Sequence, residues 1–297
     1  MKGAMVMVHT LQNDFLRITM AERGAELKSI TELADGTEYL FDSDPRWWKY
    51  SSPVLFPIVG KLVNNKYRAE GKEFELPGHG FARTSNFWLV NASNDSATFA
   101  LESNAATLAV YPYRFRLEIF YKLTGKEVKV IWKVINTDDK MIYFSIGAHP
   151  ALSCPIVARE NFEDCYLKFN KPEKSSRIVL LASGPLSRDR IPTLDGTELD
   201  LNYELFKGDA LVFDDLKSDE VSLCSRKSSK SITVRAKGFP YWGFWTPDKG
   251  GAPFICIEPW HGHADYFDFT GELKDKEGIR SLAVGETFET EMSFIIG

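Results

Sequence analysis

The chain has 297 residues, of which 44% are hydrophobic and 26% charged, and its formal net charge is −5. These values are ordinary for a globular protein, and the length permits one large β domain or two smaller domains. Acidic and basic residues are interspersed without a basic block, which argues against a nucleic-acid partner.

The N-terminal stretch MKGAMVMVHTLQNDF has one lysine and a short apolar run but no small-residue cleavage site, so we expect no secretory signal. No apolar stretch approaches the roughly 18 residues that span a bilayer. The four cysteines are scattered and form no C-x-x-C pair, which favours reduced thiols over disulfides or a zinc knot. Together these features predict a cytoplasmic protein with no membrane partner.

Two-residue alternation of apolar and polar side chains dominates the chain. The segments 116–124 (RLEIFYKLT) and 127–136 (EVKVIWKVIN) both alternate and are separated by a turn, which predicts a hairpin with one buried face. The segment MIYFSIG at 141–147 is continuously apolar, as in a strand covered on both sides. The segments 231–238 and 287–296 alternate again near the C-terminus.

Helical signals are few. The segments 44–50 (DPRWWKY) and 201–208 (LNYELFKG) are each long enough for a turn or two of helix, and no long amphipathic stretch with caps occurs. Many short strands separated by turn residues predict an all-β fold, a large antiparallel β-sandwich with a few short helices.

Three phrases place an ionisable side chain after an apolar run or between glycines. In ELPGHGFAR, His79 and Arg83 lie in an expected loop that a substrate can approach closely. The alternative is that His79 caps a turn and Arg83 pairs with a surface carboxylate. In MIYFSIGAHPAL, His149 ends a strand before Pro150, and it is either a cleft residue or a core histidine bonded to a carbonyl.

The third phrase, FICIEPW, places Glu258 at the end of a buried run beside Pro259 and Trp260. Partial desolvation raises the pKa of such a carboxyl toward the range of a general base. The alternative is a buried salt bridge, with Arg83 as a possible partner.

His261 and His263 form an H-x-H pattern, to which Asp265 or Asp268 would add a carboxylate for a metal. Because the pair lies in a Gly- and Asp-containing loop, we expect a surface loop instead. No glycine-rich phosphate-binding pattern and no nucleophile elbow is present.

Taken in order, seven phrases resemble the aldose 1-epimerase (mutarotase) superfamily, most closely its LacX-like branch. They are RGAELKSITELADGTEYLF, PVLFPIVGKL, LPGHGFAR, FSIGAHPAL, GDALVFDDL, FPYWGFWTP and CIEPWHG. The resemblance covers nearly the whole chain. It implies a single galactose mutarotase-like β-sandwich domain over residues 1–297 with a sugar cleft on one open face.

The resemblance also implies roles for particular residues. Glu258 matches the general base and His149 the general acid, while His79 matches a sugar-binding histidine with Arg83 beside it. Asp209, in GDALVF, matches an aspartate that holds sugar hydroxyls. No metal or organic cofactor is implied.

One position departs from the galactose-acting members, which carry an early arginine where this chain has Lys61. A lysine is a point charge and does not reproduce the bidentate contact of a guanidinium. The identity of the sugar therefore stays open, as does the oligomeric state. Trp245 or Trp260 would offer a flat face to the sugar.

The implied function is the interconversion of the α and β anomers of an aldohexose by acid/base ring opening and reclosure. The partner is then a small-molecule sugar. Three alternatives remain: a non-catalytic carbohydrate-binding protein, a hexose-6-phosphate mutarotase, and a metal-dependent enzyme that uses His261 and His263.

Overall fold

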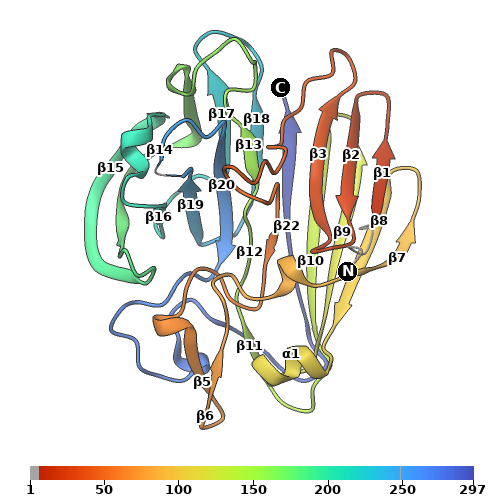
Figure 1. Ribbon diagram of the computed structural model, residues 1–297, viewed down its shortest axis with the longest axis vertical. Helices are drawn as coiled ribbons and strands as arrows, with labels where there is room; N and C mark the ends of the chain where they lie inside the picture. The colour runs from red at the N-terminus through yellow and green to blue at the C-terminus, as the bar shows by residue number, and fades with distance from the viewer. Residues whose placement is uncertain (1–6, 248) are drawn as a thin grey trace.

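The computed structural model describes residues 7–247 and 249–297, and most of its regular structure is β-strand, which confirms the all-β prediction (Figure 1). The largest sheet has 15 strands, and its named pairs are antiparallel. In hydrogen-bonded order its strands are β4 (Val54–Leu55), β12 (Ile146–Ala148), β20 (Phe254–His261), β19 (Tyr241–Trp245), β16 (Leu211–Phe213), β14 (Cys165–Leu180), β17 (Glu220–Ser225), β18 (Ile232–Arg235), β22 (Thr287–Ile296), β10 (Glu127–Asn136), β9 (Phe115–Thr124), β8 (Ser96–Glu102) and β7 (Trp88–Ala92), with β13 (Ala151–Ser153) beside β20 and β15 (Leu186–Asp200) beside β14.

Three smaller sheets and several short helices complete the described structure. The small sheets contain β1 (Val8–Gln12), β2 (Leu16–Ala21) and β3 (Glu26–Glu32); β5 (Lys66–Ala69) and β6 (Lys72–Glu75); and β11 (Ile142–Phe144) and β21 (Arg280–Leu282). The helices are α1 (Ala105–Val110) and the 3-10 turns η1 (Val63–Asn65), η2 (Ala82–Thr84), η3 (Phe162–Asp164), η4 (Tyr203–Phe206) and η5 (Leu273–Asp275).

The predicted hairpin is confirmed as β9 and β10. Every second side chain of both strands is buried, and the register places Val128 opposite Leu123 and Trp132 opposite Ile119. One face of the hairpin therefore belongs to the main core, as alternation requires. The segments predicted near the C-terminus form β18 and β22, which pair with each other.

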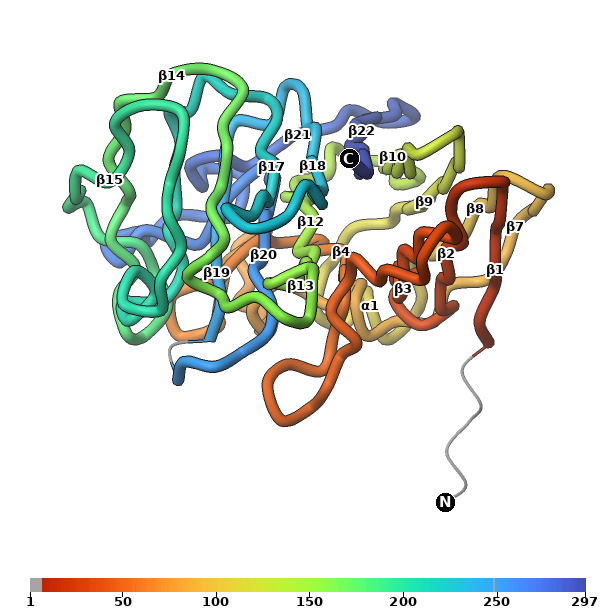
Figure 2. Tube along the Cα trace, turned by 90° about the horizontal axis from the view of Figure 1, so that it is seen from above, coloured from red at the N-terminus to blue at the C-terminus, as the bar shows by residue number. Residues whose placement is uncertain are grey.

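The β1–β3 sheet lies against the β8–β10 side of the main sheet, at the opposite end of the molecule from β14 and β15 (Figure 2). The two sheets share one hydrophobic core. A polar contact also joins them, because the buried Tyr121 hydroxyl of β9 donates to the carbonyl of Ala25, at 2.7 Å. The result is the layered sandwich that the sequence predicts.

The apolar run 141–147 forms two short strands rather than one. β11 pairs with β21, whereas β12 pairs with β20 and β4. The strands separate at Ser145, whose amide donates to the carbonyl of Pro57. The change of partner directs the chain after β12 toward β20, and this is what brings His149 to Glu258.

The helix predictions are partly confirmed. Residues 203–206 form η4, but the segment 44–50 holds only a turn, in which the amides of Trp47 and Trp48 donate to the carbonyl of Asp44. The sequence analysis missed α1, a short helix that begins at the capping box of Asn104 and Thr107.

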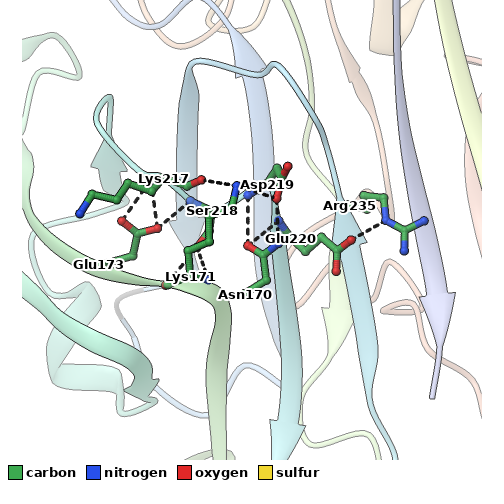
Figure 3. A network of polar contacts seen from close by, with 8 residues as sticks. All are labelled: Asn170, Lys171, Glu173, Lys217, Ser218, Asp219, Glu220 and Arg235. Carbon is green, nitrogen blue, oxygen red and sulfur yellow. Dashed lines mark hydrogen bonds and ion pairs between the residues drawn. The ribbon is translucent and has the colours of Figure 1, made fainter.

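Buried Glu173 of β14 fixes the segment between β16 and β17 (Figure 3). Its carboxylate accepts hydrogen bonds from the backbone amides of Lys217 and Ser218, at 3.0 and 2.7 Å. The side-chain amide of Asn170 donates to Asp219, at 2.7 Å. These bonds hold the chain that follows β16 against β14.

All four cysteines are free thiols, as predicted, and Cys224 is the one that is not fully buried. No helix within the described ranges combines the length and the apolar character needed to cross a membrane.

Candidate active site

Strands β20, β19 and β16 are neighbours in the main sheet (Figure 1). Their residues contribute to the lining of a cavity of about 580 Å³. All eight site residues expected from the sequence line it, although they come from segments far apart in the chain. They are Lys61, His79, Arg83, His149, Asp209, Trp245, Glu258 and Trp260.

Glu258 and His149 are in direct contact on the wall of this cavity. His149 Nε2 lies 3.2 Å from Glu258 Oε2, and the two residues are only 7% and 1% exposed. Glu258 lies within β20, opposite Gly243 of β19. A side chain at 243 would lie about 2.4 Å from the Trp260 ring, so the glycine leaves space for the indole next to the carboxyl.

Burial disfavours the charged form of both members of this pair. It raises the pKa of Glu258 well above its ordinary value, and the nearby Asp209 carboxylate adds to the rise. Burial also lowers the pKa of His149, assisted by His79 and Arg83. Burial therefore favours a protonated Glu258 beside a neutral His149. This state differs from the ion pair by one proton moved across the 3.2 Å contact.

His79 lies in a loop, as expected, and its ring faces that of His149 edge-on with centroids 5.4 Å apart. The amide of Gly60 donates to His79 Nδ1, at 3.2 Å, so the proton of the neutral ring is on Nε2. Burial lowers the pKa of His79 to about 3, with Arg83 and Lys61 contributing. His79 is thus a neutral ring with one N–H donor.

Gly80 determines how this loop approaches the sheet. Its φ is +69°, and a Cβ at this position would lie 2.3 Å from the carbonyl oxygen of Phe56. Only glycine fits such a close backbone approach without displacement. Of the two glycines that flank His79, Gly80 is therefore the one that steric contact requires.

We expect Gly80→Ala to lower the free energy of unfolding by about 2–4 kcal/mol, because it combines backbone strain with overpacking. Gly71→Ala is the matched control, since Gly71 has a φ of +74° but no atom near its absent Cβ. The control should lose about 1 kcal/mol. Urea unfolding measures both values, and equal losses would contradict the steric explanation.

Arg83 does not form the salt bridge with Glu258 that was one alternative for that carboxyl. Its guanidinium donates to the carbonyl of Gly78, at 2.8 Å, and lies over the ring of Tyr50. The Arg83 charge nevertheless lowers the pKa of Glu258, partly opposing the effect of burial. Arg83 therefore acts on the carboxyl through space.

Of the eight predicted cavity residues, Asp209 and Lys61 are the exposed ones. Asp209 has a φ of +73°, and its carboxylate accepts from the amide of Ala210 just before β16. The Lys61 side chain passes Gly184, where a Cβ would lie 2.2 Å from Lys61 Cδ. Among the residues with described coordinates, Lys61 has no carboxylate partner within ion-pair distance.

Trp48 is a cavity residue that the sequence analysis missed. Its ring stacks on His149 with centroids 4.6 Å apart and an interplanar angle of 30°. Trp245 approaches the same imidazole edge-on, at 5.6 Å. The aromatic cluster WWKY is the one feature of the sequence that distinguishes this segment. It does not predict that Trp48 contacts His149, which lies 101 positions later in the chain.

The predicted surface loop at His261 and His263 is wrong, because both rings are buried. His261 Nδ1 accepts from Arg280, at 2.7 Å, and its Nε2 lies 2.9 Å from the Thr290 hydroxyl. His263 Nδ1 lies 2.6 Å from the carbonyl of Ala264. Within the described chain, the group spaced to share a metal ion is His149, Cys256 and Glu258, not the H-x-H pair.

Comparison with known proteins gives consistent results. A family model described as aldose 1-epimerase matches residues 7–280, a range that contains all eight predicted cavity residues. The chromosomal protein LacX of Lactococcus lactis subsp. lactis is 38% identical over 282 residues, which are 92% of this chain and 93% of that protein.

Two solved structures resemble this chain over nearly its whole length. A galactose mutarotase related enzyme from Lactobacillus acidophilus has a TM-score of 0.93 and 32% identity, covering 98% of this chain and 97% of its own. A galactose mutarotase-like protein from Lactobacillus casei ATCC 334 also has a TM-score of 0.93, with 30% identity and coverage of 98% and 100%.

Proposed function

Because the chain belongs to the aldose 1-epimerase family of isomerases, we propose that it interconverts the α and β anomers of a neutral aldohexose. The observation that carries this proposal is the Glu258–His149 contact on the wall of a cavity of about 580 Å³. One base and one acid are what the exchange of anomers requires.

In the proposed mechanism, Glu258 accepts the proton of the C1 hydroxyl while His149 donates a proton to the ring oxygen. The C1–O bond of the ring breaks and leaves the open-chain aldehyde. Rotation about C1–C2 and reclosure with reversed proton transfers yield the other anomer. No proton is gained or lost overall, so one proton on the pair is sufficient.

The proton must lie on His149 when ring opening begins, whereas burial favours it on Glu258. Sugar hydroxyls that donate to the Glu258 carboxylate would stabilise its charged form, as the Arg83 charge does. The face of Trp48, stacked on His149, would stabilise the imidazolium. His79 and Asp209 would orient the hydroxyls around this centre.

Polarimetry tests the proposal directly. Freshly dissolved α-glucose and α-galactose should approach equilibrium rotation faster with the protein than without it, in proportion to enzyme concentration. Saturable sugar binding without any acceleration would instead identify a non-catalytic carbohydrate-binding protein.

The charge of the cavity favours a neutral sugar. Lys207 pairs with Glu204, at 2.6 Å, and Arg83 is engaged with Gly78 and Tyr50. This leaves Lys61 as the lining cation without a carboxylate or carbonyl partner in the part of the chain that the structure describes. A single lysine is a weak site for a phosphate dianion, which arginine forks and backbone amides bind best.

We expect Lys61→Met to lower kcat/KM for glucose and for glucose 6-phosphate by the same factor, about tenfold. This is the scale of one hydrogen bond to a charged group. Lys66→Met, at a lysine paired with Glu73, is the control and should change neither value. A loss confined to the phosphorylated sugar, shrinking as salt rises, would show that Lys61 binds phosphate and would overturn the preference for a neutral sugar.

A further inference from the structure

A buried thiol lies beside the proposed acid/base pair. Cys256 precedes Glu258 by two residues on β20, so the two side chains share one face of the strand. Its exposure is 0%, and its register neighbours are Ala151 of β13 and Trp245 of β19. The proposed mechanism gives this thiol no role.

The thiol, the imidazole of His149 and the carboxyl of Glu258 each offer one ligand atom, and these atoms all lie within 4.8 Å of one another. Imidazole nitrogen, thiolate sulfur and carboxylate oxygen are all ligands of zinc. Typical zinc bonds of about 2.0–2.3 Å in tetrahedral geometry separate the ligand atoms by about 3.3–3.7 Å.

The present spacing is close to that geometry. His149 Nε2 and Glu258 Oε2 are 3.2 Å apart, and the Cys256 sulfur lies within 4.8 Å of the ligand atoms of both residues. His149 and Glu258 both line the cavity, which leaves the fourth position open to water or another small ligand. Three protein ligands with one open position are a common zinc arrangement.

We propose that His149, Cys256 and Glu258 form a zinc-binding site that inhibits the enzyme when occupied. Zinc would bind the lone pairs of His149 and Glu258. The same lone pairs would accept the protons that are transferred at C1 and at the ring oxygen in the proposed mechanism. Inhibition should therefore compete with sugar. This inhibitory role rests on the proposed mutarotase activity, whereas metal binding itself does not.

The charges of these ligands are compatible with zinc in this buried site. Zinc binds cysteine and glutamate in their deprotonated forms, so binding would release a proton from Cys256 and from Glu258. The divalent ion would balance the two negative charges that result.

Cobalt(II) is the probe for binding, because a tetrahedral cobalt–thiolate site has a charge-transfer absorption in the near ultraviolet. We expect the wild-type protein to show this band at about one cobalt per chain and to lose it when zinc is added. Cys256→Ser and Cys256→Ala should lack the band. Cys224→Ser should keep the band, because Cys224 lies on β17, which is separated from β20 by β19, β16 and β14 in the main sheet.

The activity arm uses the same variants. Cys256→Ser and Cys256→Ala should retain mutarotation, but the zinc concentration for half inhibition should rise at least about tenfold, as expected for a lost ligand. Having two variants guards against misfolding of either one.

Each contrary outcome is distinct. Absence of the cobalt band in the wild type would overturn the site, even if the protein proved inactive as a mutarotase. A band that persists in the Cys256 variants would also overturn it. A normal band together with zinc-insensitive mutarotation would overturn the inhibitory role.

Discussion

Glu258→Gln is expected to lower kcat for mutarotation by at least about a hundredfold, the scale of losing a general base. The glutamine keeps the shape of the side chain but cannot accept the C1 proton. Among the described residues, the ion-pair partner of the carboxyl is His149 and not Arg83. Folding should therefore stay close to wild type, which the Tm and the urea midpoint would check.

The pH profile of the wild type depends on the protonation of the same pair. The pair is active with one proton, and it would gain a second only well below pH 6.5, because burial lowers the pKa of His149. It would lose its proton only well above pH 4.5, because burial raises the pKa of Glu258. We therefore expect a plateau of kcat/KM between these two limits, and in Glu258→Gln the alkaline limb should move to lower pH, because His149 alone would carry the proton.

A well-folded Glu258→Gln variant with near wild-type kcat would rule out the carboxyl as the base. Asp14→Asn, at a carboxyl that does not line the cavity, is a suitable control for the loss of one negative charge and should leave kcat unchanged. An acid limb near pH 6.5 in the wild-type profile would show that the pKa of His149 is not lowered by burial as described.

His149→Asn is expected to lower kcat by about a hundredfold or more with little change in KM, because it removes the group that donates to the ring oxygen. His79→Asn should instead raise KM more than it lowers kcat. His79 is a neutral donor held by the Gly60 amide and is placed to bind a hydroxyl rather than to move a proton.

Steady-state kinetics of the two variants in parallel separate these roles. His9→Asn, at a histidine of β1 that pairs with Glu22, is the matched control for loss of an imidazole and should behave as wild type. The reverse pattern, with His79→Asn costing kcat and His149→Asn costing KM, would exchange the roles of the two histidines.

The β9–β10 hairpin shows how much of the fold local patterning could predict. Its apolar side chains recur at every second position, and that period directly identifies the buried face of each strand. The apolar run 141–147 shows the limit of this reasoning, because a continuous run does not reveal where a strand changes partner. The break at Ser145 depends on a bond to Pro57, far away in the sequence.

The residues of the candidate site divide in the same way. Polar or ionisable groups that follow apolar runs, such as His149 and Glu258, could be selected from the sequence because burial of such groups is costly without a partner or a role. Trp48 and Cys256 carried no such signal. The error over His261 and His263 has the same origin, since glycine and aspartate neighbours suggested a loop but did not show what packs over it.

Local spacing and composition are enough to identify the all-β class, the main hairpin and the residue types available for acid/base chemistry, because these features need no contact between distant segments. Three contacts instead come from the packing of distant segments: Glu258 touches His149, Trp48 stacks on the imidazole, and the Cys256 sulfur lies near both members of the pair. Those contacts join β20, the end of β12 and the segment before β4. Pairing between strands that are distant in the sequence produces no periodic pattern from which it could be predicted. The preferred protonation of the pair follows from the same packing, since burial shifts both pKa values toward the neutral forms.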